Sequence, residues 1–473
     1  MKKDVYDFPI IPLADESPSA YADRVGIYYA STVTNAHKKD NGQFFTPLEI
    51  AMFMASFAKV EKEDIRILDP GCGIGILSIA LIEQLATRTK KIRRLELVVF
   101  ETDVNILPFA ESCFEYLRIW LNERNIDFTI FLCKNDFILH NSVVLNNVEK
   151  SNETYDIVIS NPPYFKLPGD DERALAAKSV INGQTNIYTI FLLIAAKLLK
   201  DDGHLIFITP RSFCSGNYFR LFREIFFSIV DLKEIHLFNS RKSAFKKDKV
   251  LQENIIIKAA KSSKTESNNS YIEKDLIISA SSGISDIGQR RIKRYEYRSL
   301  INLDSYQKIL HLPTSDTDEK IIEVFKTWTG SLKLYDLEIS TGPVVDFRST
   351  SMIKPKPSKN TVPLIWLHNV ESMNVIWPRN NGYKGKPKGQ YIINEKESLS
   401  RLVKGRNYVL VRRFSTKDDN RRLVAAPFFS RHHSDMKMIG IENHLNYIYH
   451  KKHELTIEQT IGLAAILNSR LFD

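Results

Sequence analysis

Short apolar runs alternate with longer amphipathic segments between about residue 65 and residue 260. The runs are rich in β-branched and aromatic residues, as is typical of strands that are buried on both faces of a sheet. Seven such runs are IRILDP, LELVVFE, DFTIFLC, YDIVIS, GHLIFITP, LKEIHLF and NIIIKA. This alternation of strands with helical segments predicts a doubly wound α/β sheet.

Three of the segments between the runs have helical periodicity. They are SIALIEQLATR after the first run, PFAESCFEYLRIWLNER after the second, and IYTIFLLIAAKLLKDDG before the fifth. Helices placed between successive strands support right-handed crossovers. Gly203 ends the third segment, and we expect this glycine to cap the helix C-terminus.

The pattern changes beyond residue 260. Residues 261–290 are rich in Ser, Asn and Lys around one short apolar run, which predicts an edge hairpin or a loop that leaves the sheet. After a boundary near 300–320, Pro, Gly, Lys, Arg, Trp and Tyr are mixed in short strands and long loops. We therefore expect one domain over residues 1–310 and a different, α+β domain over residues 320–473. The last helical stretch ends without a cap, so we expect the native chain to continue beyond Asp473.

Charge is divided unequally along the chain. The net charge of +10 comprises −5 over residues 1–240 and +15 over residues 241–473. A basic half beside a mildly acidic one indicates a polyanionic partner held mainly by the second half, although a solubilising surface bias is the alternative. The four cysteines are scattered, and no apolar stretch reaches the ~18 residues of a membrane span. We expect no metal site, no disulfide and no membrane partner, and a cytoplasmic location.

Glycines follow the first predicted strand, where residues 69–75 read DPGCGIG. A Gly-rich turn at the carboxyl end of a strand lets a ligand approach the backbone. A dinucleotide site would need a further glycine at Ser78 to complete GxGxxG, whereas DPGCGxG resembles motif I of class I methyltransferases. S-adenosylmethionine is therefore favoured over NAD, with Asp69, Gly71 and Gly73 in its site.

Acidic residues follow the second and third predicted strands. Glu101 stands where a carboxylate can accept both ribose hydroxyls of a bound nucleoside, and Asp103 is the alternative. Asp136 can accept from the adenine amine of the cofactor, while Phe137 offers an aromatic face to its ring. The other interpretation of Asp136 is that its side chain caps a helix.

The fourth predicted strand ends in Asn161-Pro162-Pro163-Tyr164. Successive prolines fix φ and hold the chain extended at the strand exit. In that frame the Asn161 amide oxygen and the Pro162 carbonyl can both accept from an adenine amine, which draws electron density onto a poor nucleophile, while Tyr164 stacks on the base. The alternative is that the tetrad only ends a strand, but its position downstream of the glycine-rich turn favours the chemical role.

This order of motifs makes residues 41–260 resemble the gamma-class, TaqI-like N6-adenine DNA methyltransferases of restriction-modification systems. The resemblance implies a Rossmann-like class I methyltransferase fold with a doubly wound mixed sheet, S-adenosylmethionine as methyl donor, and a flipped-out adenine in double-stranded DNA as target. The sequence NGQFFTP at residues 41–47 is similar to the family's motif X. That similarity implies that Phe45 and Thr46 close over the methionine part of the cofactor, beside Asn161.

Two further resemblances concern the target DNA. The sequence FKKDKV at residues 245–250 is similar to the family's motif VIII, which implies that Phe245 stacks on the flipped adenine opposite Tyr164; a core role for Phe245 is the alternative. Residues 335–473 resemble, more loosely, the target-recognition part of the family, although any one basic residue there can equally be a solvated surface charge. The basic residues expected to contact DNA are Lys354, Lys356, Lys384, Lys386, Lys388, Arg412, Arg413, Arg421 and Arg422.

Other functions compete with this hypothesis. Loops of the NPPY type also suit RNA bases or a protein glutamine amide, and a catalytically idle DNA-binding subunit would keep both the sheet and the basic domain. A fused nuclease is not expected, because only about 40 residues precede motif X and no PD…(D/E)xK pattern is evident. The resemblance implies a monomer that acts at the prokaryotic nucleoid, either beside a separate cognate restriction endonuclease or as an orphan enzyme.

Overall fold

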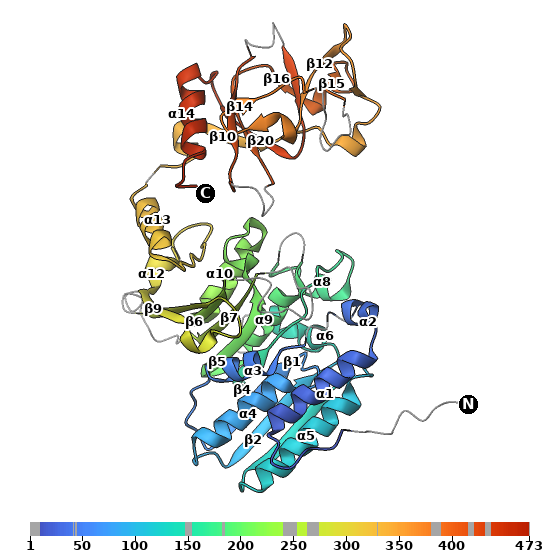
Figure 1. The fold of residues 1–473 in the computed structure, drawn as a ribbon, viewed down its shortest axis with the longest axis vertical. Helices are drawn as coiled ribbons and strands as arrows, with labels where there is room; N and C mark the ends of the chain where they lie inside the picture. The colour runs from blue at the N-terminus through green and yellow to red at the C-terminus, as the bar shows by residue number, and fades with distance from the viewer. Residues whose placement is uncertain are drawn as a thin grey trace, which may run out of the picture. The chain divides into compact units, whose positions relative to one another are not determined.

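The computed structural model forms two compact units, Met1–Asp318 and Glu319–Asp473, and each unit is considered by itself (Figure 1). No helix among the described residues is long and apolar enough to cross a membrane. The structure describes residues 10–40, 42, 45–146, 154–181, 185–239, 253–262, 274–328, 330–379, 389–414, 421–430 and 437–472.

The first unit is built on a nine-stranded sheet of order β3-β2-β1-β4-β5-β7-β6-β8-β9. Strands β1 to β5 are parallel to one another, and β7 lies antiparallel between β5 and β6. This topology confirms the predicted Rossmann-like class I methyltransferase fold with a mixed, doubly wound sheet. The strands are β1 (Asp64–Pro70), β2 (Arg94–Phe100), β3 (Asp127–Cys133), β4 (Tyr155–Ser160), β5 (Leu199–Pro210), β6 (Val230–Phe238), β7 (Asn254–Lys261), β8 (Asp275–Ser281) and β9 (Arg291–Glu296).

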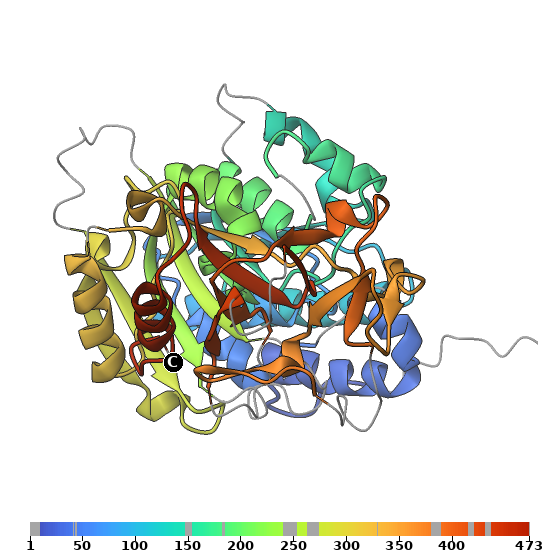
Figure 2. The ribbon, with the colours of Figure 1, turned by 90° about the horizontal axis from the view of Figure 1, so that it is seen from above.

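Helices cover both faces of this sheet, and Figure 2 shows the blue N-terminal helices and the green helices on opposite sides of it. One face carries α1 (Pro18–Thr32), α3 (Leu48–Ala55), α4 (Ile76–Arg88) and α5 (Leu107–Asn122). The other face carries α6 (Phe137–His140), α7 (Ser142–Asn146), α8 (Glu172–Ala176), α9 (Ile187–Lys197), α10 (Arg220–Ile229) and α12 (Tyr297–Leu300). The short α2 (Asn35–Asp40) follows α1.

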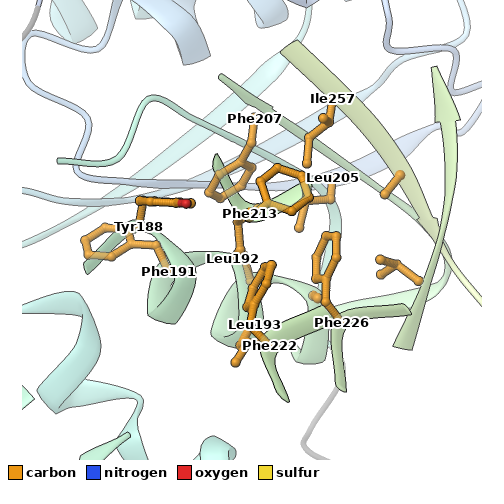
Figure 3. Close-up of a cluster of buried hydrophobic side chains, with 14 of the residues drawn as sticks. Tyr188, Phe191, Leu192, Leu193, Leu205, Phe207, Phe213, Phe222, Phe226 and Ile257 are labelled. Atoms are coloured by element: carbon orange, nitrogen blue, oxygen red, sulfur yellow. The ribbon is translucent and has the colours of Figure 1, made fainter. Parts of the chain in front are cut away.

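Two hydrophobic cores result from the alternation of side chains along the strands. In β5, Leu205 and Phe207 belong to the core under α9 and α10, whereas Ile206 and Ile208 belong to the core under α1, α3, α4 and α5. Figure 3 shows the first of these cores, in which aromatic rings from α9 and α10 close over β5 and β7. Near-continuous apolar runs are therefore required in the central strands, which are buried on both faces, whereas the edge strands β3 and β9 are partly exposed.

The prediction for Gly203 is wrong. Helix α9 already ends at Lys197, β5 begins at Leu199, and Gly203 lies inside this strand. The pairing of β4 with β5 shifts register at this place, and a Cβ on Gly203 would approach the carbonyl oxygens of Lys200 and Tyr155 to within 2.9 and 3.0 Å. The glycine is needed for close backbone approach at the irregularity rather than for a helix cap.

The segment after residue 260 contains the edge hairpin. Strand β8 pairs in parallel with β6 and antiparallel with β9 at the end of the sheet. These two strands extend the sheet beyond the seven strands that the sequence predicted. Their neighbouring residues are polar and the apolar run is short, so the sequence does not indicate a central strand here. The chain then enters α13 (Asp316–Thr327), within which the two units divide.

In the part of the second unit that the structure describes, short strands surround small cores, and they form no second α/β sheet. Its sheets have the orders β10-β20-β17-β18, β11-β15-β12-β19-β16 and β13-β14. Helix α14 (Ile457–Leu467) begins with a capping box, in which Thr456 and Gln459 exchange hydrogen bonds of 3.0 and 3.1 Å. The strands are β10 (Leu337–Thr341), β11 (Ile353–Lys354), β12 (Thr361–Ile365), β13 (Val370–Glu371), β14 (Asn374–Val375), β15 (Tyr391–Ile393), β16 (Leu402–Lys404), β17 (Tyr408–Arg412), β18 (Ala425–Phe428), β19 (Met438–Ile441) and β20 (Leu445–His450).

Candidate cofactor and base site

A cavity lies at the carboxyl ends of β1, β2, β3 and β4 in the first unit. In an open parallel sheet this edge is where ligands bind, because the loops that leave successive strands meet there. The sequence-predicted residues that line it are Phe45, Thr46, Gly71, Gly73, Glu101, Asp136, Phe137, Asn161 and Pro163. The structure thus brings together, around one cavity, residues from five separate segments of the sequence.

The glycine-rich turn after β1 forms one side of the cavity. Gly71, Gly73 and Gly75 have φ values of 77°, 57° and 87°, which other residues adopt only with strain. The amides of Gly71 and Cys72 both donate to the Phe100 carbonyl, at 2.9 and 3.0 Å, so the turn is attached to the end of β2. At Gly71 and Gly73, the turn therefore exposes backbone atoms to the cavity without a covering side chain.

Asp69 lies behind this turn and does not line the cavity. Its side chain is fully buried, and burial raises the pKa of its carboxyl to about 7, while the nearby Ser78 opposes the shift. The Ser78 hydroxyl donates to the Gly75 carbonyl at 3.1 Å, and neither Asp69 oxygen has a partner in hydrogen-bonding geometry among the described residues. Asp69 is thus placed to shape the turn rather than to touch a ligand directly.

Glu101 rather than Asp103 faces the cavity. One Glu101 carboxylate oxygen accepts from the Gly73 amide at 2.9 Å and the other from the Asp103 amide at 2.8 Å. Burial raises the pKa of Glu101, and these two amides oppose the shift. Asp103 is only 6% exposed and accepts from Tyr29, with the His37 ring beside it, so its carboxylate is engaged away from the cavity.

Asp136 caps a helix and also lines the cavity. Its Oδ1 accepts from the amides of Ile138 and Leu139, at 2.8 and 3.0 Å, and so caps α6. Its Oδ2 lies 3.7 Å from a guanidinium nitrogen of Arg173, and the residue lines the cavity. A carboxylate has acceptor capacity for both tasks. The neighbouring Phe137 is buried beside the cavity.

The NPPY loop meets motif X at the cavity. The Asn161 amide nitrogen donates to the Thr46 hydroxyl at 3.0 Å, and the Tyr164 hydroxyl donates to the Asn161 amide oxygen. The Tyr164 hydroxyl also lies 2.9 Å from the Ile208 carbonyl, one residue beyond the last pair of the β4–β5 ladder. Prolines cannot extend that ladder because they lack N–H groups, and the phenol supplies a donor there instead.

Burial raises the pKa of Tyr164 well above its usual value, so its hydroxyl stays protonated and can donate. Its ring packs edge to face with that of Tyr188, at 6.3 Å between centroids. At the base of the same loop, the Ser160 hydroxyl donates to the Pro70 carbonyl at 2.6 Å. The end of β4 is thereby fixed to the end of β1, where the glycine-rich turn begins.

Sequence reasoning missed several residues that line or support the cavity. Phe191 lies one helical turn after Ile187 on α9, and both line the cavity, although their apolar pattern in the sequence is typical of core residues. Arg173 also lines it and is held by Asp171 through bonds of 2.9 and 2.6 Å. No motif marks Arg173. For Ile187 and Phe191, one signal was available in the sequence. Both lie in the first turns of the helix that follows the NPPY loop, where side chains can reach the cavity.

The predicted DNA-contact residues show different environments in the second unit. The Arg412 guanidinium donates to the Val370 carbonyl at 2.7 Å, and that of Arg421 donates to the Asn468 carbonyl at 2.7 Å, so both are tied into the fold. Arg413 lies over Phe414, with 5.4 Å between guanidinium carbon and ring centroid. Lys356 and Arg422 are exposed and Lys354 is half-buried. Phe245, Lys384, Lys386 and Lys388 lie outside the described residues.

Several known proteins are similar to this chain. A sequence profile of the Eco57I restriction-modification methylase family matches residues 84–245. The type II methyltransferase M.BsuBI of Bacillus subtilis is 33% identical over 443 residues, which are 92% of this chain and 84% of that protein. The type II methyltransferase M.PstI of Providencia stuartii is 31% identical over 446 residues, 94% of this chain and 84% of that protein. Among solved structures, the type IIG restriction endonuclease BpuSI matches 96% of this chain and 58% of its own, with 13% identity and a TM-score of 0.46.

Proposed function

Since the chain belongs to the type II methyltransferases of restriction-modification systems, we propose that it methylates the exocyclic N6 amine of adenine in double-stranded DNA. S-adenosylmethionine is the methyl donor of this DNA methyltransferase. The observation that carries the proposal is the position of the Asn161 amide. It lines the cavity and is held there by hydrogen bonds with the Thr46 and Tyr164 hydroxyls. An amide in this position can accept from a planar exocyclic amine.

The residues around the cavity fit S-adenosylmethionine. Glu101 offers carboxylate oxygens to ribose hydroxyls, and Asp136 offers one to an adenine amine. Phe137 and Phe191 supply the aromatic wall that a purine needs, while the glycine-rich turn leaves room for the backbone to approach the ligand. When bound, the donor would supply a methyl group carried on a positively charged sulfur.

The chain's own residues would act on the target amine by hydrogen bonding and positioning. The Asn161 amide oxygen and the Pro162 carbonyl accept the two amine hydrogens, which increases electron density on the nitrogen and orients its lone pair. In the present structure the Tyr164 hydroxyl occupies that amide oxygen, so the arriving amine takes its place. The Ile208 carbonyl, 2.9 Å away, is then the remaining acceptor for the phenol.

Access to the amine requires the adenine to leave the duplex, at a cost of a few kcal/mol in lost pairing and stacking. We propose that the ring of Tyr164 offsets part of this cost by stacking on the base, with Phe245 on its other face. The basic second unit, residues 320–473, would hold the duplex and read its sequence, through Lys354, Lys356, Arg413 and Arg422 among the described candidates. Residues 1–310 would carry the chemistry.

The test is a labelling experiment with competing substrates. The protein is incubated with S-adenosylmethionine labelled in the methyl group and with duplex DNA of diverse sequence, RNA or a glutamine-containing protein, beside an Asn161→Ala variant. Label in DNA adenine only, absent from the variant, supports the proposal. Label in RNA or protein with unlabelled DNA contradicts it. No observation in the structure favours either of those substrates.

The remaining biological assignments belong to the same proposal. We infer that the enzyme acts as a monomer on its site, in the cytoplasm and at the nucleoid, because a single chain here carries both the cavity and the basic unit. A separate restriction endonuclease that cuts the same sequence would be its partner in defence. Size measurements of the protein with and without DNA test the monomer directly.

A further inference from the structure

Two residues of the N-terminal helices reach the strand end that carries Glu101. Tyr29 lies on α1 and His37 on α2, both upstream of the segment that matches the family profile. The Tyr29 hydroxyl donates to Asp103 Oδ2 at 2.9 Å, and His37 Nε2 lies 2.7 Å from the same oxygen. Asp103 therefore has a partner on each of the two helices.

Asp103 is joined in turn to Glu101. The Asp103 amide donates to one Glu101 carboxylate oxygen at 2.8 Å, and the Gly73 amide donates to the other at 2.9 Å. Asp103 Oδ1 accepts from the Asn105 amide at 3.0 Å, which closes the turn after β2 on itself. The orientation of the Glu101 carboxylate thus depends on a turn whose outer side is held by α1 and α2.

Tyr29 supports a second wall of the cavity as well. Its ring meets that of Phe45 edge to face, at 5.9 Å between centroids, and Phe45 lines the cavity. On another side the Tyr29 ring packs against Phe109, at 5.1 Å. The Tyr29 side chain is only 1% exposed, so one buried residue connects the motif X wall with the Glu101 wall.

We propose that Tyr29 and His37 are positioning residues for the cofactor, which through Asp103 hold the Glu101 carboxylate toward the ribose of bound S-adenosylmethionine. This inference rests on the proposed function only as far as the identity of the ligand in the cavity. It assigns a functional task to the helices before motif X, which neither the motifs nor the family profile include.

Electrostatics explains why Asp103 needs these partners. The Asp103 charge raises the pKa of Glu101, adding to the larger effect of burial. Two neighbouring buried carboxylates repel each other unless donors neutralise one of them. The Tyr29 hydroxyl and the His37 ring reduce the charge that Glu101 experiences, and so favour the ionised, cavity-facing form of Glu101.

The test measures cofactor binding without DNA, by calorimetry with S-adenosylmethionine. The bonds to Asp103 are present without the cofactor, so only part of their strength contributes to binding. We expect about a five- to tenfold larger dissociation constant for Tyr29→Phe and for His37→Ala. His37→Gln keeps a donor and should stay within about twofold of the wild type. Tyr28→Phe, on the same helix and half-exposed, is the matched control and should change nothing.

A second arm distinguishes positioning from general support of the fold. In a Glu101→Ala background the acceptor is gone, so Tyr29→Phe should add less than about twofold to the dissociation constant. Unchanged affinity in both single variants, or an undiminished effect in the Glu101→Ala background, would overturn the inference. Because no DNA is present, these outcomes are independent of whether adenine in DNA is the substrate, which the labelling experiment decides.

Discussion

The two units of this chain use polar residues in opposite ways. In the first unit, motif residues that are far apart in sequence converge on one cavity, because parallel strands deliver their carboxyl ends to one edge of the sheet. In the second unit, short antiparallel strands point in many directions, and candidate arginines such as Arg412 and Arg421 donate to backbone carbonyls instead. Sequence position therefore predicts which residues meet at one cavity in the first unit, but not which basic residues are tied into the fold of the second.

The sharpest test of the first unit is removal of the Asn161 amide. Asn161→Ala deletes the acceptor for the target amine, and loss of one such preorganised group lowers kcat by about 10²–10³-fold. Cofactor affinity, measured by calorimetry, should change by less than about threefold, since Glu101 and Asp136 remain. A variant that loses cofactor binding in proportion to kcat would instead make Asn161 a residue of the cofactor site.

Substitutions of Tyr164 separate its ring from its hydroxyl. Tyr164→Ala removes the stacking surface and should lower kcat/KM by about 100-fold, whereas Tyr164→Phe keeps the ring and should stay within about tenfold of the wild type. Steady-state kinetics on duplex DNA with an unmethylated recognition site checks both values. Equal loss in the two variants would assign the role to the hydroxyl and its bonds to Asn161 and Ile208.

Cofactor binding should depend on pH through Glu101. Burial raises the pKa of Glu101. As pH falls, Glu101 therefore becomes protonated at a higher pH than an ordinary glutamate, and the carboxylate proposed to accept from the ribose is lost. We expect the dissociation constant for S-adenosylmethionine to increase about tenfold as pH falls one unit below that pKa. Calorimetry between pH 5 and pH 8 checks this, and Glu101→Gln should bind weakly with a flatter profile. An equally steep profile in Glu101→Gln would assign the titration to another group.

Substitution of single arginines in the second unit should have smaller effects, on DNA binding for some arginines and on stability for others. Arg422→Ala, at an exposed residue, should weaken DNA binding by about two- to fivefold and lower its salt dependence. Arg412→Ala removes a bond to the Val370 carbonyl and should instead lower stability by about 1 kcal/mol. Binding titrations at two salt concentrations, with thermal unfolding, separate the two. The reverse result would show that Arg412 is the DNA contact.

The smallest expected effect concerns Asp69. Its folded-state pKa of about 7 lies above the usual value for an aspartate, so its contribution to stability is present at low pH and is lost as pH rises through 7. Asp69→Asn should therefore raise Tm by a few degrees at pH 8 relative to the wild type, and by less at pH 5. Thermal unfolding at both pH values checks the sign. A lower Tm at pH 8 would mean that ionised Asp69 stabilises the turn.

Much of the first unit was predictable because strand period, glycine turns and the NPPY tetrad are local signals. Gly203 was misjudged because register between β4 and β5, a long-range property, determines its role. Tyr29 and His37 carry no motif, since their task depends on a contact with Asp103 across more than 60 residues of sequence. In the second unit, the sequence indicates short strands, but which basic side chains bond to the fold depends on packing that no local pattern encodes.

The central claim is most directly tested in a host that lacks adenine methylation and expresses this protein. Single-molecule sequencing of its DNA, with chromatography of the nucleosides, identifies both the modified base and its sequence context. We predict N6-methyladenine at one short recognition sequence, and none in cells that express the Asn161→Ala variant. Methylation of cytosine N4 at that sequence, or no modified base in DNA, would contradict the assignment of adenine as the target.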